Sequence, residues 1–277
     1  MDHDAILKLS EVLKIAGLSK TALNKAMKAG TFPAPVQIVP AETPCEVKLE
    51  RLRTLRGLQH LFPRKHVDYL HQMKTEGIEP SVIYDVGANV LHWTREAKKV
   101  WPCAVYIAFD AMHEAAVIYG EEHIQYYIGL LSDHDGKEVR FYVSPKHPGG
   151  NSYYKENYII NEHANEYFLE SNARKLKTVT LDTAVRGKHR PAPDLVKMDI
   201  QGAEMDVLKG AQECLKTCKD LIVELQTVEY NKGAPLRDEV IAYIYSLGFQ
   251  LRKGPFCDNG PDGDYHFTAM ASAVTSN

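Results

Sequence analysis

The sequence predicts an α/β fold, in which a doubly wound and mostly parallel seven-stranded sheet follows a small helical N-terminal module. From residue 81 onward, short apolar runs alternate with segments of helical spacing, the pattern of a parallel sheet with crossover helices. The last two apolar runs have no helix between them, so they should form an antiparallel hairpin at the sheet edge. Four prolines between residues 33 and 44 separate the helices of the N-terminal module from the rest of the chain.

The N-terminal part of the chain predicts a helical module that ends in a linker. Residues 5–30 have the spacing of two short helices joined by a tight turn. Helical spacing returns over residues 46–76 after the prolines. We therefore place the N-terminal module and its proline-rich linker at residues 1–46, and one larger domain at residues 47–277.

The larger domain predicts its elements in a regular order. Helices are expected up to Val100, near 113–119, and over 203–215 and 236–248. The run at 138–144 has the character of a local hairpin strand. The other runs expected as strands are 81–87, 104–110, 123–131, 194–200, 220–226, 249–254 and 264–270.

The composition indicates a globular cytoplasmic protein. The chain has 277 residues, of which 44% are hydrophobic and 25% charged. No apolar run approaches the roughly 18 residues of a membrane helix, and the acidic start does not resemble a signal peptide. The five cysteines form no CxxC pair, which favours reduced thiols over a disulfide or cysteine-metal site.

The charge is distributed unevenly along the chain. Residues 1–65 carry 11 Lys and Arg against 6 Asp and Glu, and the remainder carries 22 against 30. The net charge is therefore +5 at the front and −8 behind, which gives the total of −3. An acidic body argues against nucleic acid as the main substrate.

The turn after the first predicted strand indicates a nucleotide-like cofactor. The strand ends at Asp85 and Gly87, and no further glycine appears before Gly120. A dinucleotide site needs G-x-G-x-x-G to bring a pyrophosphate to a helix N-terminus, and a P-loop needs its own glycines and lysine. A cofactor without phosphate does not, and S-adenosylmethionine is such a cofactor.

Carboxylates follow three successive predicted strands. Asp85 suits the cationic part of S-adenosylmethionine, and Asp110 suits the two ribose hydroxyls. Ser132 and Asp133 are placed to meet the adenine edge. Taken singly, each aspartate could instead cap a helix. Their common position at strand ends, where ligands of open parallel sheets bind, favours the cofactor interpretation.

Six sequence motifs in the larger domain are characteristic together: "IYDVGANVLHWT" (83–94), "LSDHDG" (131–136), "GGNSYY" (149–154), "TLDTAV" (180–185), "LVKMDIQGAEMDVLKGA" (195–211) and "LIVEL" (221–225). With these motifs the chain resembles the FkbM-type methyltransferases from about residue 66 to its end. The resemblance implies a class I, Rossmann-like fold and S-adenosylmethionine-dependent O-methylation of a sugar, glycan or related natural-product hydroxyl. It keeps Asp85, Gly87 and Asn89 as cofactor-binding residues, but Leu91 stands where many members have glycine.

The expected catalytic residues lie on the predicted strands at 194–200 and 220–226. Lys197 and Asp199 are two positions apart, so both should point to one side of the sheet. Glu224 lies in an apolar strand and needs a partner, for which we expect Lys197. The three form either a buried ion pair or a cluster that activates the acceptor. Their carboxylates could also bind Mg²⁺ or Ca²⁺, and Glu204 could cap the next helix.

A polar, glycine-rich segment at 147–157 predicts the acceptor site. Amides and tyrosines supply hydrogen bonds and flat faces for a sugar, whereas the alternative is an exposed loop. The matching position in the FkbM family favours the first interpretation. The residues expected to bind the acceptor are Gly150, Asn151, Ser152, Tyr153 and Tyr154.

Residues 6–38 resemble the small helix-turn-helix of MerR- and AlpA-like DNA-binding proteins. The resemblance implies DNA contact through residues 10–30, with lysines on the second helix. The alternative is a helical cap over the enzyme or a contact within a homo-oligomer. For the whole chain, the corresponding alternative function is a DNA-binding protein with a degenerate methyltransferase body.

Overall fold

The computed structural model describes residues 63–187 and 189–270. The predicted N-terminal module, its proline-rich linker, the boundary at residues 46 and 47 and the helix-turn-helix lie outside the described residues. The predicted helix at 46–76 is described only from its second half, where α4 spans Arg64–Thr75. Of the described helices, none is long and apolar enough to cross a membrane.

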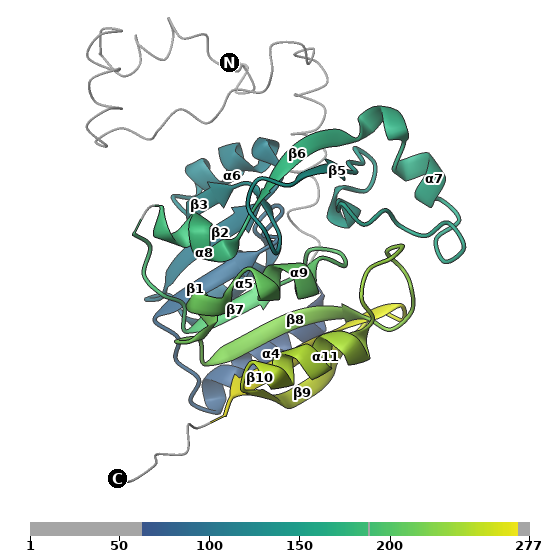
Figure 1. The fold of residues 1–277 in the computed structure, drawn as a ribbon. Coiled ribbons are helices and arrows are strands. Elements are labelled where there is room, and N and C mark those ends of the chain that lie inside the picture. Colours follow the sequence, from purple (N-terminus) through teal and green to yellow (C-terminus); the bar gives the residue numbers. More distant parts are fainter. Residues whose placement is uncertain (1–62, 188, 271–277) are drawn as a thin grey trace, which may run out of the picture. The chain divides into compact units, whose positions relative to one another are not determined.

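A seven-stranded sheet forms the centre of the described region, in the order β3-β2-β1-β7-β8-β10-β9 (Figure 1). The first five strands in this order are parallel, whereas β10 is antiparallel to both β8 and β9. The predicted mostly parallel sheet with a C-terminal antiparallel hairpin is therefore confirmed. The strands are β1 (Val82–Val86), β2 (Val105–Asp110), β3 (Gln125–Ile128), β7 (Leu195–Met198), β8 (Asp220–Gln226), β9 (Phe249–Asp258) and β10 (Asp262–Ala269).

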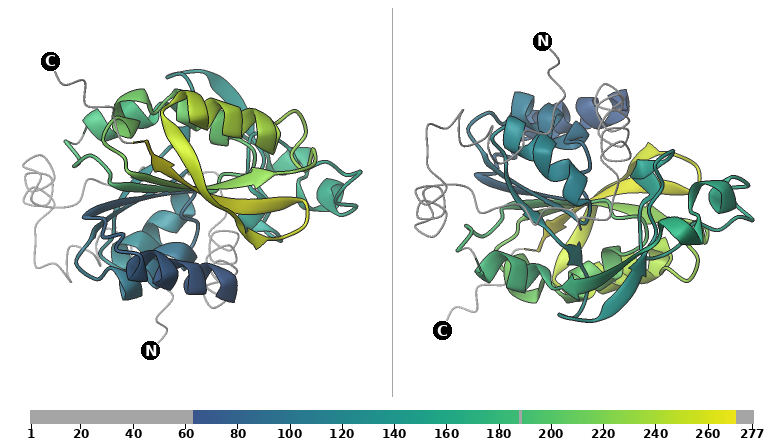
Figure 2. Two further views of the ribbon diagram at one scale, coloured as in Figure 1. Left: turned by 90° about the horizontal axis from the view of Figure 1, so that it is seen from below. Right: turned by 90° about the horizontal axis from the view of Figure 1, so that it is seen from above.

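Helices cover both faces of this sheet (Figure 2). On one face, α4 packs with α5 (His92–Val100) and α6 (Ala116–Glu121) over one apolar cluster. On the other face, α8 (Leu181–Arg186), α9 (Glu204–Lys209), α10 (Gln212–Leu215) and α11 (Arg237–Ser246) cover a second cluster. The single helix predicted at 203–215 is observed as two helices, α9 and α10. A side chain at Gly210, between its halves, would lie 2.2 Å from the Ser132 carbonyl oxygen.

The residues between β3 and β7 correct one prediction. The run at 138–144 is not half of a local hairpin, because β5 (Glu138–Phe141) pairs with the distant β6 (Arg174–Val179). With β4 (Leu130–Leu131), these strands form a small sheet in the order β4-β6-β5. The sequence "RKLKTV" gave no strand signal, because its alternate residues are exposed and three of the six are basic.

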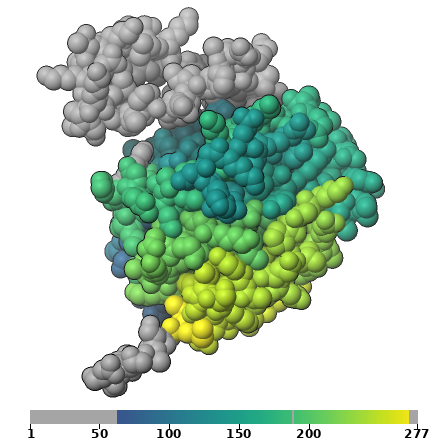
Figure 3. Space-filling view, in the orientation of Figure 1, coloured from purple at the N-terminus to yellow at the C-terminus, as the bar shows by residue number. Residues whose placement is uncertain are grey.

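In Figure 3 the excursion between β5 and β6 lies at the upper right of the coloured face, and α11 lies below it. This excursion contains the predicted acceptor loop. Its short helices are η2 (Pro148–Gly150), α7 (Ala164–Tyr167) and η3 (Glu170–Asn172), and η1 (His113–Ala115) precedes α6.

Candidate active site

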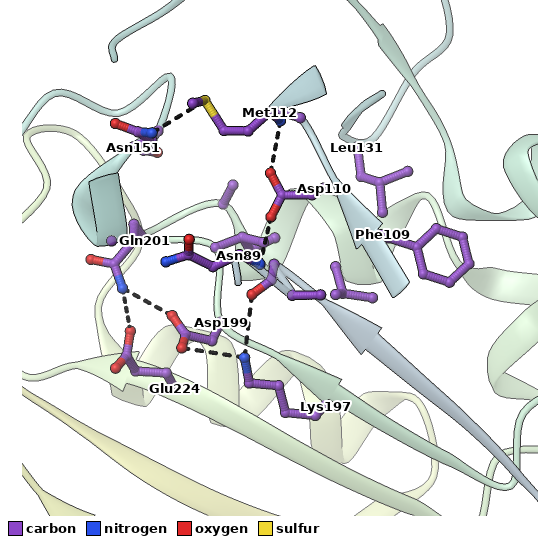
Figure 4. Close-up of a pocket in the computed structure, with 18 of the residues that line it drawn as sticks. Asn89, Phe109, Asp110, Met112, Leu131, Asn151, Lys197, Asp199, Gln201 and Glu224 are labelled. Carbon is purple, nitrogen blue, oxygen red and sulfur yellow. Dashed lines mark hydrogen bonds and ion pairs between the residues drawn. The ribbon is translucent and has the colours of Figure 1, made fainter. Parts of the chain in front are cut away.

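A cavity of about 250 Å³ lies at the carboxyl ends of the parallel strands. This is where an open parallel sheet binds its ligand. The close-up in Figure 4 shows side chains from β2, the turn after β7 and β8 that converge on it. The predicted site residues that line it are Gly87, Asn89, Asp110, Asn151, Ser152, Tyr153, Lys197, Asp199 and Glu224.

The turn after β1 brings the backbone close to the turn after β7. Gly87 has a φ of +78°, and a side chain here would lie 1.9 Å from the Asp199 carbonyl oxygen. Only glycine meets both conditions. Leu91 is also left-handed, with φ 64° and ψ 27°, and is fully buried. Leucine therefore keeps the conformation that a glycine would adopt easily, and α5 still begins at His92.

Asp110 lies at the end of β2 and faces the cavity. Its carboxylate accepts hydrogen bonds from the backbone N–H groups of Asn89 and Met112, at 2.8 and 2.7 Å (Figure 4). Burial raises the pKa of Asp110 to about 6, although both backbone donors lower it. Each oxygen of a carboxylate can accept a second hydrogen bond. The group is thus suited to hold hydroxyl donors of a ligand.

Lys197 joins two carboxylates at the ends of β1 and β7. Its ammonium lies 3.4 Å from Asp85 and 3.3 Å from Asp199. Burial opposes the charge of Lys197, but these carboxylates raise the pKa of the lysine above its ordinary value. Burial alone would raise the pKa of Asp199. The Lys197 ammonium and the hydrogen bonds to this carboxylate have the larger effect and lower its pKa. Lys197 therefore keeps Asp199 ionised.

Glu224 has a partner other than the expected Lys197. The amide of Gln201 donates to Glu224 at 2.6 Å and to Asp199 at 2.9 Å (Figure 4). Burial and the nearby Asp199 raise the pKa of Glu224 well above its ordinary value, which favours its uncharged form. Gln201 reaches both groups from a backbone φ of +56°. A left-handed backbone at a glutamine cannot be predicted from the sequence pattern, so the sequence does not predict Gln201 as a site residue.

Three of the predicted cofactor residues do not line the cavity. Asp85 is buried behind the wall, where Thr94 donates to it at 2.6 Å. Ser132 donates to Asp133 at 3.1 Å and lies 3.3 Å from the Tyr153 hydroxyl. The predicted contact of Ser132 and Asp133 with adenine therefore stays a prediction. The cavity also has an apolar wall, which includes Phe109, Leu130, Leu131 and Phe141.

The acceptor loop is held against α9 by its tyrosines. Tyr153 and Tyr154 both donate from their hydroxyls to the Asp206 carboxylate, at 2.8 and 2.9 Å. Tyr154 and Gly150 do not line the cavity, whereas the other three predicted acceptor residues do. The hydroxyl of Tyr154 thus has a structural partner, and its role in binding a sugar stays a prediction.

Several residues of the cavity wall could not be found from the sequence. His66 and Asp264 are separated by 198 positions and lie 2.7 Å apart through Nε2 and Oδ2. Together with Cys257, they are the one group of three metal-ligand side chains found close together in the described ranges. Glu204 lies in the first turn of α9 and accepts a hydrogen bond at 2.9 Å from the backbone of Ile200, which precedes the helix, so its predicted capping role stays a prediction. The other unpredicted wall residues include His92, Trp93 and Asn259.

The strand order and the position of the cavity describe a ligand-binding α/β fold. The sheet is doubly wound and ends in an antiparallel hairpin, and the cavity lies at the ends of its parallel strands. The family model described as the methyltransferase FkbM domain matches residues 85–251. The chain belongs to the FkbM methyltransferase family, and S-adenosylmethionine is its methyl donor.

Two kinds of similarity accompany this assignment. The chain is 26% identical over 179 residues to the hexuronic acid methyltransferase AglP of Haloferax volcanii, covering 63% of this chain and 65% of that protein. The human N-acetylserotonin methyltransferase in complex with SAM aligns over 94% of this chain and 70% of its own, with 12% identity and a TM-score of 0.43. The ribosomal protein L11 methylase of Lactobacillus delbrueckii subsp. bulgaricus covers 76% and 81%, with 11% identity and a TM-score of 0.41.

Proposed function

We propose that this methyltransferase transfers its methyl group to a hydroxyl of a sugar or glycan. The similarity to a hexuronic acid methyltransferase supports a carbohydrate acceptor. Amide side chains around the cavity, among them Asn151, Gln201 and Asn259, supply the donors and acceptors that sugar hydroxyls require. The observation that carries the proposal is the carboxyl group of Asp199 at the end of β7, which lines the cavity and lies 3.3 Å from the Lys197 ammonium.

The wall residues near β1 and β2 fit S-adenosylmethionine. Asp110 would accept hydrogen bonds from the ribose hydroxyls, because its two backbone donors leave further acceptor positions. Gly87 provides close backbone approach, and Phe109 and Leu131 provide apolar surface for a flat base. When bound, this cofactor supplies a methyl group activated by its sulfonium.

Asp199 would act on the acceptor hydroxyl. Lys197 and Gln201 hold its carboxylate, so one orientation is fixed before the acceptor binds. The lowered pKa makes Asp199 a weak base toward a free hydroxyl. Its role would be to orient the hydroxyl and to accept the proton as the oxygen becomes acidic during transfer. Glu224 is less suited to this role, because its raised pKa favours the protonated form.

The test is transfer of labelled methyl from S-adenosylmethionine to a panel of glycans. Wild type, Asp199→Asn and the exposed control Asp238→Asn should be compared. We expect label on a glycan hydroxyl, a turnover about 10²–10⁴-fold lower in Asp199→Asn, and no change in Asp238→Asn. Label that enters a protein, nucleic acid or lipid but no glycan would refute the proposed acceptor.

A further inference from the structure

Carboxyl groups from three neighbouring strands form one end of the cavity. Asp199 follows β7, Glu224 lies on β8 and Asp264 lies on β10, and all three line the wall. Glu224 and Asp264 are direct partners in the antiparallel register of β8 and β10. Like charges in such a position destabilise a sheet unless they are neutralised. This end, which we call the acidic end, lies away from Asp110 and the apolar wall.

The basic side chains at the acidic end contact its carboxyl groups. Lys197 is the single lysine or arginine that lines the cavity within residues 63–187 and 189–270. Its ammonium contacts Asp85 and Asp199 and lies 3.5 Å from the Gly87 carbonyl oxygen. His66 is hydrogen-bonded to Asp264. A further anion placed here would face Asp199 and Asp264.

We propose that the acceptor sugar carries no negative charge at the ring that enters the cavity. This inference rests on the proposed glycan methylation and narrows it. Carboxylates accept hydrogen bonds from sugar hydroxyls, and the amides of Gln201 and Asn259 supply donors beside them. A uronate would instead bring its carboxylate next to like charges, which specific sites use to reject wrong partners. The acceptor thus differs in charge from the hexuronic acid named for the similar archaeal enzyme.

The experiment uses three matched oligosaccharides that differ only in one terminal ring: a glucoside, a 2-amino-2-deoxyglucoside and a glucuronide. Methyl transfer from labelled S-adenosylmethionine gives kcat/KM for each, and binding to the full chain is measured by ligand-observed NMR. We expect the glucuronide to be at least about tenfold poorer than the better of the other two. This difference should shrink as salt is added, because screening weakens charge repulsion.

Charge-neutral variants show whether the acidic end causes the discrimination. Asp264→Asn should narrow the gap between glucoside and glucuronide, whereas Glu162→Gln should not, because the Glu162 side chain is 89% exposed. A glucuronide that is methylated as well as or better than the others would overturn the inference and leave the proposed function intact. A gap that Asp264→Asn does not narrow would also overturn it. If none of the three is methylated or bound and no other glycan takes up label, the proposed function itself fails.

Discussion

Replacing Lys197 with methionine should strongly destabilise the protein. Methionine keeps most of the length of the side chain and removes its charge. The Lys197 side chain is 6% exposed and that of Asp85 is 1% exposed, so solvent cannot replace the lost ammonium. Breaking a buried pair from one side costs about 3–5 kcal/mol. We expect a loss of this size in the free energy of unfolding, measured by urea denaturation at neutral pH.

The pH dependence of this loss identifies its cause. In the wild type the pKa of Asp199 is lowered, so its pairing contributes stability above the unfolded pKa and loses it as pH falls through the folded pKa. Without Lys197, burial would instead raise the pKa of Asp199, so mild acid would neutralise this carboxylate in the folded state. The penalty of Lys197→Met should therefore shrink between about pH 7 and about pH 5.

An exposed lysine provides the matched control. Lys219 pairs with Asp194 at 2.9 Å, but its side chain is 71% exposed. Lys219→Met should cost no more than about 1 kcal/mol, as surface ion pairs do. If Lys197→Met costs as little as this control, or costs the same at both pH values, the buried ion pair does not hold the two turns together.

Three further substitutions test other parts of the site. Gly87→Ala should abolish folding or cofactor binding by calorimetry, because its methyl group would meet the Asp199 carbonyl; normal binding would disprove the close approach. Leu91→Gly should lower the free energy of unfolding by less than Leu208→Ala, which should cost about 2–5 kcal/mol. Both leucines are fully buried, but only Leu91→Gly relieves a left-handed backbone worth about 1–2 kcal/mol. Asp206→Ala should leave cofactor affinity unchanged and increase proteolysis of the 147–157 loop; an unchanged cleavage rate would show that Tyr153 and Tyr154 do not anchor it.

The sequence predicted those parts of the fold that depend on local pattern. Apolar runs and helical spacing located β1, β2, β7, β8 and the final hairpin. The two-residue period of a strand predicted that Lys197 and Asp199 share one side, and they lie 3.3 Å apart. The alternating, half-exposed β6 gives no such signal, so the sequence predicts a local hairpin for the run that contains β5, whereas β5 pairs with β6.

The remainder of the site depends on tertiary contacts. His66 meets Asp264 only because α4 packs against β9, the strand paired with β10, in the folded chain. Gln201 bridges Asp199 and Glu224 because its backbone is left-handed, and no residue pattern in the sequence predicts this conformation. The sequence suggests Lys197 as the partner of Glu224, because the position of the Gln201 side chain cannot be predicted from the sequence. In the structure Gln201 is the residue that donates a hydrogen bond to Glu224.

Calorimetric titration of S-adenosylmethionine into the wild type and Asp110→Asn tests the central claim most directly, because it needs no acceptor. The wild type should bind one equivalent. Loss of a charge-assisted hydrogen bond to the ribose should weaken binding by about tenfold or more in Asp110→Asn, whereas the exposed Asp238→Asn should match the wild type. Equal affinity in Asp110→Asn and the wild type, or no binding by the wild type, would contradict the assignment of this cavity as the cofactor site.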